Sequence, residues 1–223
     1  MDDVLLRERR FRMVEEQLRL RSIYDKRILE SVKKVPRHLF LDEQYWNIAY
    51  ADHPVPLGRS HSLPQPYLIG LMMQALEIRP QHKVLEIGTG TGYQSALMAE
   101  IASQVFSIDH HQAVYESAKS RLKEYGYRNI KCSLPKKCVG WPTQGPFDRI
   151  LLVKAARCIP KELLKQMSSR SIMVMPVGNK GSATQEVVKV TRNNDTFSCA
   201  KIAQVSGLPF FQGHKMTPAD LEY

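Results

Sequence analysis

A glycine-rich segment at residues 84–94, VLEIGTGTGYQ, contains residues that could hold a small ligand. Gly88, Gly90 and Gly92 allow the backbone to turn sharply and to approach a ligand without an intervening Cβ atom. A strand before these glycines and a helix after them would leave free N–H groups at the start of the helix, which favour an anionic group. The segment therefore predicts a ligand-binding turn between a strand and a helix.

This turn favours S-adenosylmethionine over phosphate-containing ligands. A phosphate-binding loop would contain Gly-Lys-Ser or Gly-Lys-Thr, which is absent, and a dinucleotide fingerprint would have glycine in place of Tyr93. S-adenosylmethionine carries a carboxylate but no phosphates, so it needs a smaller anion site. Glu86 would be unfavourable beside a pyrophosphate but suits a ligand with an ammonium and a sulfonium. Glu86 and Thr89 therefore join the three glycines in the predicted cofactor site.

A second acidic residue follows the next predicted strand, QVFSI at residues 104–108. Asp109 comes directly after it, about twenty residues beyond the glycines, where an acid can accept hydrogen bonds from both ribose hydroxyls. The alternative is a tight turn with a solvated aspartate. His110 is included in the predicted cofactor site because of its place in the chain, with a solvated surface histidine as the alternative.

Short apolar strands alternate with helices after residue 80. Strands are predicted at residues 83–87, 104–108, 129–133 and 148–153, and helices at 93–102, 113–126 and 161–167. This alternation predicts an α/β fold with a parallel sheet covered on both faces. Three further strands are predicted at residues 171–177, 186–192 and 197–205. Because they follow one another closely, with a turn at residues 193–195, they predict an antiparallel extension.

The first 80 residues have a different pattern. Residues 3–20 predict an amphipathic helix, and Asp25 could cap a second helix that must end before Pro36. A short helix is predicted near residues 41–49, and Pro66 opens a buried helix. We therefore divide the chain into residues 1–80, an N-terminal helical cap with a substrate loop, and residues 81–223, the core, within one compact unit.

Composition limits the class of protein. The 223 residues are 43% hydrophobic and 24% charged, as expected for a globular protein. No apolar run approaches the roughly 20 residues of a membrane helix, and the N-terminus does not have the pattern of a signal peptide, so we expect a cytoplasmic protein without a membrane partner. The 4 cysteines and 7 histidines have no spacing typical of a metal site, so no metal is predicted.

The net charge of +10 suggests an anionic partner, either nucleic acid or an acidic peptide. No tract of lysine and arginine interleaved with aromatic residues is present, and no nucleic-acid-binding module is found. Nucleic acid is therefore not the expected partner. The alternative to any partner is a basic surface that keeps the protein soluble.

Several segments together resemble the protein-L-isoaspartate O-methyltransferase family in that family's order. They are MVEEQLRLRSI (13–23), VPRHLF (35–40), AYADHPVPLG (49–58), QPY (65–67), VLEIGTGTGYQSALMA (84–99), GWP (140–142), PFD (146–148) and PVG (176–178). The resemblance implies a class I, Rossmann-like methyltransferase with N-terminal helices and a rearranged C-terminal part of the sheet. It also implies transfer of a methyl group from S-adenosylmethionine to the free carboxylate of L-isoaspartyl residues in damaged proteins, with the ester then closing to a succinimide.

The resemblance identifies an acceptor site in SLPQPY, residues 62–67, where the family commonly has Thr-Ile-Ser-Gln-Pro. Ser62 keeps a hydroxyl at the threonine position, whereas Pro64, at the serine position, has neither hydroxyl nor N–H. Asp52 matches a family position near the substrate, and its alternative role is to cap the turn before Pro54. Ser62 and Asp52 are thus the predicted catalytic residues.

Other positions depart from the family pattern. Pro135-Lys136-Lys137 replaces a usual Gly-Asp-Gly whose aspartate lies near the adenine, and an ammonium cannot accept the hydrogen bond of an amino group. Val153-Lys154 replaces a usual Thr-Ala, and Ser22 replaces a common glycine. The three lysines could attract an acidic acceptor.

Three hypotheses remain open from the sequence. The first is methyl transfer to isoaspartyl or similarly acidic peptide sites by a monomeric enzyme. The second is the same chemistry directed to a different dedicated acceptor. The third is a non-catalytic homologue that binds a partner. Because the acceptor carboxylate is already ionised at neutral pH, the reaction needs no general base, and the enzyme supplies mainly alignment and exclusion of water.

Overall fold

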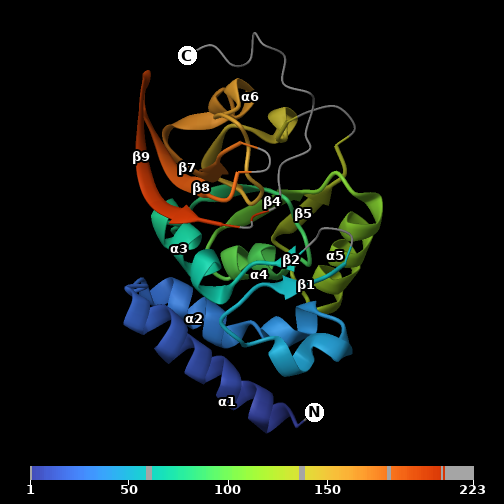
Figure 1. Cartoon of the computed structure of the whole chain (residues 1–223). Coiled ribbons are helices and arrows are strands. Elements are labelled where there is room, and N and C mark those ends of the chain that lie inside the picture. Colours follow the sequence, from blue (N-terminus) through green and yellow to red (C-terminus); the bar gives the residue numbers. More distant parts are fainter. Residues whose placement is uncertain (1, 59–61, 136–138, 180–181, 207, 209–223) are drawn as a thin grey trace.

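The computed structural model describes residues 2–58, 62–135, 139–179, 182–206 and 208, and its centre is a seven-stranded sheet (Figure 1). The strand order is β5-β4-β3-β6-β7-β8-β9. Its strands are β3 Lys83–Ile87, β4 Gln104–Ile108, β5 Ile130–Ser133, β6 Phe147–Leu152, β7 Met167–Val177, β8 Gln185–Asn193 and β9 Thr196–Val205. Strands β3 to β7 pair in parallel, and β7, β8 and β9 pair antiparallel. The predicted parallel sheet and its antiparallel extension are both confirmed.

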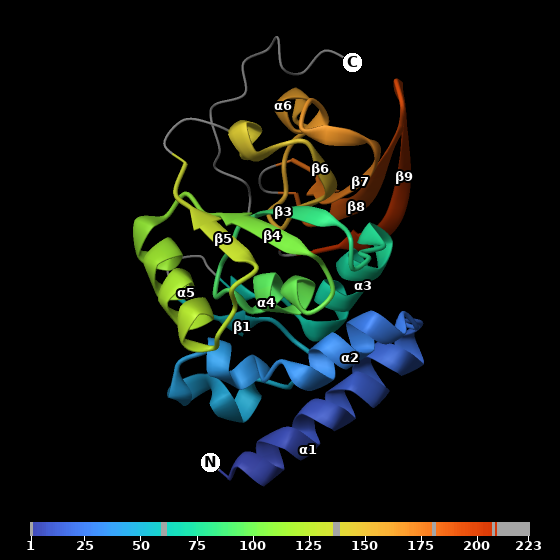
Figure 2. The same cartoon turned by 180° about the vertical axis from the view of Figure 1, so that it is seen from behind.

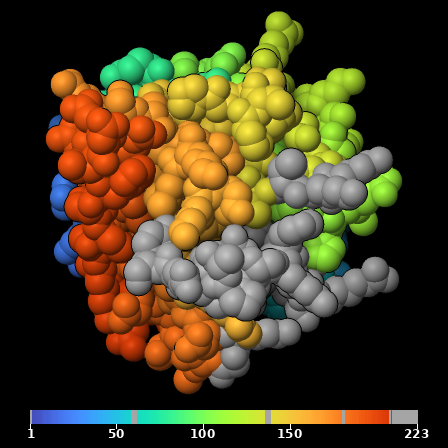
Figure 3. All heavy atoms as spheres, turned by 90° about the horizontal axis from the view of Figure 1, so that it is seen from above, coloured from blue at the N-terminus to red at the C-terminus, as the bar shows by residue number. Residues whose placement is uncertain are grey.

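Helices cover both faces of this sheet. They are α1 Asp3–Met13, α2 Lys26–Lys34, α3 Pro66–Leu76, α4 Tyr93–Ala99, α5 Gln112–Glu124 and α6 Lys161–Leu164. Helices α3 and α4 lie between the sheet and the N-terminal helices α1 and α2, and α6 lies on the opposite side (Figures 1 and 2). Seen from the α6 side, β9 forms one flank of the molecule (Figure 3).

Alternation along each central strand divides the apolar residues between the two faces. Val84, Val105 and Leu151 belong to the hydrophobic cluster that includes the N-terminal helices. Leu85 and Phe106 belong to the second cluster, beneath α6. Because the first cluster contains residues from both sides of position 80, the N-terminal cap is packed onto the core. The division at residue 80 itself stays a prediction.

Two predicted helices differ from the structure. The helix expected at residues 161–167 is one turn long, because Met167 already pairs with Phe147 as the start of β7. The segment expected near residues 41–49 forms the 3-10 helix η4, Glu43–Ile48.

The N-terminal helix changes geometry before it ends. After α1 it continues as the π-helical segment η1, Val14–Leu18, and the 3-10 turn η2, Arg19–Arg21. Ser22 follows with a left-handed backbone, φ 67°. Asp25 then caps α2 as predicted, because its side chain accepts a hydrogen bond from the Arg27 N–H. Among the described residues, no helix is long and apolar enough to cross a membrane.

Replacing Ser22 by glycine should stabilise the protein. A left-handed backbone costs an L-residue with a Cβ about 1–2 kcal/mol, and glycine avoids this penalty. The gain is partly offset because glycine loses more conformational entropy than serine on folding. We expect the Ser22→Gly variant to raise the free energy of unfolding by about 0.5–1 kcal/mol in urea titrations. Ser22→Ala keeps the unfavourable φ and serves as the control, for which no gain is expected. Equal stability of the two variants would contradict this account.

Candidate active site

A cavity of about 560 Å³ lies at the carboxyl ends of β3, β4 and β6, and we call it the ligand cavity. Strand β3 is paired on one side with β4 and on the other with β6, so this edge is the switch point where ligands bind in open α/β sheets. The lining residues are Phe40, Leu41, Asp42, Leu57, Gly58, Ser62, Leu63, Pro64, Gly88, Thr89, Gly90, Thr91, Gln94, Asp109, His111, Ala113, Val114, Ser117, Arg121, Val153 and Lys154. A larger cavity of about 830 Å³ lies near the amino ends of β6 and β7, away from every predicted site residue.

The glycine loop is fixed to the end of β4 by its backbone. The N–H groups of Gly88 and Thr89 both donate to the carbonyl of Ile108, at 2.8 and 3.2 Å. Gly88 has φ +104°, a backbone conformation that residues with a Cβ rarely adopt. A Cβ at this position would lie 3.4 Å from the Val153 Cβ. The bare backbone therefore forms one wall of the ligand cavity.

Asp109 is held in place by the loop that it faces. Its carboxylate accepts hydrogen bonds from the N–H of Gly90 at 3.1 Å and from the N–H of His111 at 3.0 Å. The residue is only 2% exposed, yet it lines the ligand cavity. Each carboxylate oxygen can accept more than one hydrogen bond, so both remain able to bind a ribose hydroxyl.

Glu86 lies beneath the glycine loop and does not line the ligand cavity. It is fully buried, and its Oε2 accepts hydrogen bonds from the hydroxyls of Ser95 and Ser107, the latter at 2.6 Å. The Ser107 hydroxyl in turn lies 2.7 Å from the hydroxyl of Thr89, which does line the cavity. Burial raises the pKa of Glu86 to about 7, and the two serine hydroxyls oppose that rise. Glu86 therefore reaches the loop through a chain of hydroxyl groups.

A small hairpin forms the opposite wall of the ligand cavity. Strand β1, Val55–Pro56, pairs antiparallel with β2, Ser62–Leu63, and Ser62 and Pro64 line the cavity. Arg37 lies behind the hairpin with no exposed surface, donating to the carbonyl of Pro64 at 2.7 Å and to that of Ala49 at 2.8 Å. Burial lowers the pKa of Arg37 to about 10, so it stays a cation at neutral pH.

The structure brings most of the predicted residues together. Ser62, Gly88, Thr89, Gly90 and Asp109 line the ligand cavity, whereas Asp52, Glu86, Gly92 and His110 do not. Lys154 also lines it. Lys136 and Lys137 lie outside the described residues.

Two contributing residues were not singled out from the sequence. Arg121 lines the cavity and donates to the Thr91 carbonyl at 3.1 Å. It shares a helix face with Ala113 and Ser117 because the three residues are spaced four apart. This spacing could have predicted from the sequence that Arg121 faces the same side as they do. Arg37 lies between Pro36 and His38 in VPRHLF, and its complete burial is unexpected for an arginine.

The residues of the ligand cavity fit S-adenosylmethionine. Its volume is within the usual range of small-molecule sites, roughly 300–1,000 Å³. The glycine backbone permits close approach, and Asp109 offers acceptors to a ribose. In the described part of the chain, no group of three or more histidine, cysteine, aspartate and glutamate residues could hold a metal ion.

Comparisons with known proteins agree with this site. The family model described as Protein-L-isoaspartate(D-aspartate) O-methyltransferase (PCMT) matches residues 8–215. Protein-L-isoaspartate O-methyltransferase 1 of Syntrophobacter fumaroxidans is 45% identical over 181 residues, 81% of this chain and 84% of that protein. Protein-L-isoaspartate O-methyltransferase of Syntrophus aciditrophicus is 40% identical over 203 residues, 91% of this chain and 92% of that protein.

Solved structures share the fold. A protein-L-isoaspartate O-methyltransferase superposes with a TM-score of 0.81 at 22% identity, covering 93% of this chain and 66% of that one. A Plasmodium falciparum protein, described as a putative protein-L-isoaspartate O-methyltransferase in complex with S-adenosyl-L-homocysteine, gives a TM-score of 0.76 at 17% identity. That match covers 92% of this chain and 99% of the other.

The buried Glu86 should make stability depend on pH. Its folded pKa, about 7, lies above the ordinary value of 4.5, so between these values the folded protein binds more protons than the unfolded chain. Its contribution to the free energy of unfolding is therefore present below pH 4.5 and falls as pH rises to about 7, by up to about 3 kcal/mol.

Urea unfolding at several pH values would measure this effect. Subtracting the Glu86→Gln curve from the wild-type curve isolates the contribution of Glu86 from other titrating groups. Glu124→Gln, a change at an exposed residue, is the control. Parallel curves for wild type and Glu86→Gln would contradict the assignment.

Proposed function

Because the chain belongs to the protein-L-isoaspartate O-methyltransferase family, we propose that it methylates the free carboxylate of L-isoaspartyl sites in peptides and damaged proteins. S-adenosylmethionine is the methyl donor, and the substrate is a protein with an isoaspartyl site. The observation that carries this proposal is the ligand cavity, in which the glycine loop and Asp109 face the β1–β2 hairpin.

The chain's residues divide into a donor wall and an acceptor wall. Gly88, Thr89, Gly90 and Asp109 would hold S-adenosylmethionine, which when bound supplies an electrophilic methyl group on its sulfonium. Glu86 supports Thr89 from below through Ser107. Direct contacts of Gly92 and His110 with the cofactor stay predictions.

The acceptor wall has to align a carboxylate rather than activate it. A carboxylic acid has a pKa near 4, so the acceptor is already a nucleophile at neutral pH. Ser62 offers a hydroxyl that can donate to one carboxylate oxygen and so orient the other toward the methyl group. Orientation and exclusion of water then provide the rate enhancement.

Two cations line the ligand cavity beside two carboxylates. Lys154 and Arg121 can each pair with an acidic acceptor, while Asp42 and Asp109 balance their charge, so the cations offer a partner to the acceptor without giving the cavity a net positive charge. We expect the enzyme to act as a monomer on protein substrates, without nucleic acid. The relatives give no support to a different acceptor or to a non-catalytic role, although Pro64 departs from the family pattern.

A methylation assay tests the proposed function. Purified protein and S-adenosylmethionine are incubated with a short isoaspartyl peptide, or with the matching aspartyl peptide as control, and mass spectrometry follows a base-labile methyl gain. We expect methylation of the isoaspartyl peptide alone. No methylation of either peptide, while an established family enzyme works in parallel, would overturn the proposal.

Asp109 should determine cofactor affinity. An asparagine at this position keeps the size of the side chain but replaces a charged acceptor, which is worth about 1.5–3 kcal/mol in a hydrogen bond. We expect Asp109→Asn to weaken binding of S-adenosylhomocysteine by about 10- to 100-fold in calorimetric titrations. Asp195→Asn, in the β8–β9 turn, is the control. Unchanged affinity in Asp109→Asn would remove Asp109 from the cofactor site.

A further inference from the structure

The two legs of the β1–β2 hairpin are joined at their base by a pair of side chains. Asp52 precedes β1 and Gln65 follows β2. The Gln65 Nε2 donates to the Asp52 carboxylate at 2.7 Å and to the Asp52 carbonyl at 3.1 Å. Both bonds draw the legs together just outside the ligand cavity, which contains Ser62 and Pro64 but neither member of the pair.

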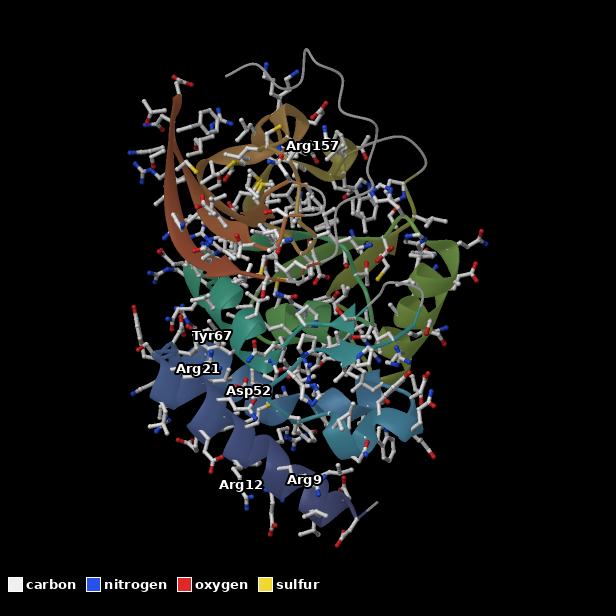
Figure 4. The ribbon with its side chains drawn as sticks, viewed as in Figure 1. Arg9, Arg12, Arg21, Asp52, Tyr67 and Arg157 are labelled. Carbon is white, nitrogen blue, oxygen red and sulfur yellow. The ribbon has the colours of Figure 1, made fainter. Side chains whose placement is uncertain are left out.

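Arg21, at the end of η2, attaches this base to the first helical segment of the chain. Its Nη1 lies 3.0 and 3.3 Å from the two carboxylate oxygens of Asp52. Its guanidinium also stacks on the ring of Tyr67, 3.6 Å from the ring centre. Figure 4 shows Arg21, Asp52 and Tyr67 side by side. Three segments far apart in sequence, the end of η2, the start of the hairpin and the first turn of α3, therefore meet at one guanidinium.

These contacts are expected to contribute little to the free energy of unfolding. The Arg21 and Asp52 side chains are 40% and 43% exposed, and exposed ion pairs contribute little to the free energy of unfolding. The nearby core is already closed by buried residues such as Leu18 and Ile69. The contacts instead restrict the position of the hairpin whose far side forms the acceptor wall.

We propose that Arg21, Asp52 and Gln65 form a hairpin latch that positions Ser62 for the methyl acceptor. Arg21 and Gln65 are positioning residues, and Asp52 acts through the hairpin rather than by touching the acceptor. This inference rests on the proposed function and revises the role expected for Asp52 from the resemblance. A hairpin released from the latch would occupy the binding-competent position for a smaller fraction of the time, which raises the apparent KM of the peptide in proportion.

Arg21→Met and Asp52→Asn both remove the ion pair, and the asparagine keeps an oxygen that can accept from Gln65. We expect each to lower kcat/KM for an isoaspartyl peptide by about tenfold, mainly through KM, as is typical when a substrate-positioning segment is displaced. Affinity for S-adenosylhomocysteine should stay unchanged. Arg21→Lys should recover part of the loss, because it restores the charge but not the planar stacking on the Tyr67 ring.

Lys201→Met is the matched control. It breaks a pair with Glu186 of similar exposure, 49% and 51%, on β8 and β9, and is expected to change neither kinetic parameter. The double variant of Arg21→Met and Asp52→Asn should be no worse than either single variant, because both remove the same interaction. If the loss of kcat/KM in the double variant equals the product of the two single losses, Asp52 contacts the acceptor itself. A loss in Asp52→Asn much larger than in Arg21→Met would have the same meaning. Unchanged kinetics in all variants would equally overturn the latch.

Hydrogen exchange separates failure of the latch from failure of the proposed function. The amides of Val55 and Leu63, which are opposite one another in the hairpin, should exchange faster in Arg21→Met and Asp52→Asn than in wild type. This readout requires no turnover. If wild type methylates no isoaspartyl peptide, the proposed function fails, and the exchange rates alone decide the latch. Unchanged exchange would reject it.

Discussion

The carbonyl of Ile108 accepts hydrogen bonds from two consecutive N–H groups of the glycine loop, and the rest of the site depends on this connection. It continues the β3–β4 pairing one step beyond the strands, so the loop cannot lift away from Asp109. Because Asp109 also accepts from the Gly90 N–H, the two ligand-binding segments fix each other. Glu86 supports the glycine loop from below through the hydroxyls of Ser95 and Ser107. Its burial is unfavourable for the charged form, because no cation among the described residues pairs with it.

Local patterns predicted the sheet and the donor wall. Runs such as 83–87 and 104–108 are short and carry apolar residues on both faces, and parallel pairing brings the residues after them to one edge of the sheet. The acceptor wall could not be predicted in the same way. The partners of Asp52 are Arg21, at the end of η2, and Gln65, just before α3, and nothing local indicates such contacts. The length of α6 likewise depends on where β7 begins.

The replacement of the family's serine by Pro64 preserves one contact of the loop. Proline removes a hydroxyl and an N–H, but its carbonyl remains, and that carbonyl is the group to which Arg37 donates. The buried Arg37 guanidinium therefore binds a backbone carbonyl of the loop, and this contact does not depend on the side chain at position 64. With Pro64 unable to donate, the Ser62 hydroxyl gains importance on this wall of the ligand cavity.

The ends of the sheet affect how this protein would behave among damaged, partly unfolded chains. An open strand edge can recruit another extended chain and seed aggregation. One edge here is β5, only 4 residues long, and the other is β9, whose pairing with β8 shifts register between Val187 and Val188. Lys201 places a charge on β9 beside that irregularity. A short edge at β5 and an irregular, charged edge at β9 disfavour strand addition, so among the described residues neither end of the sheet favours pairing with the extended chain of a misfolded substrate.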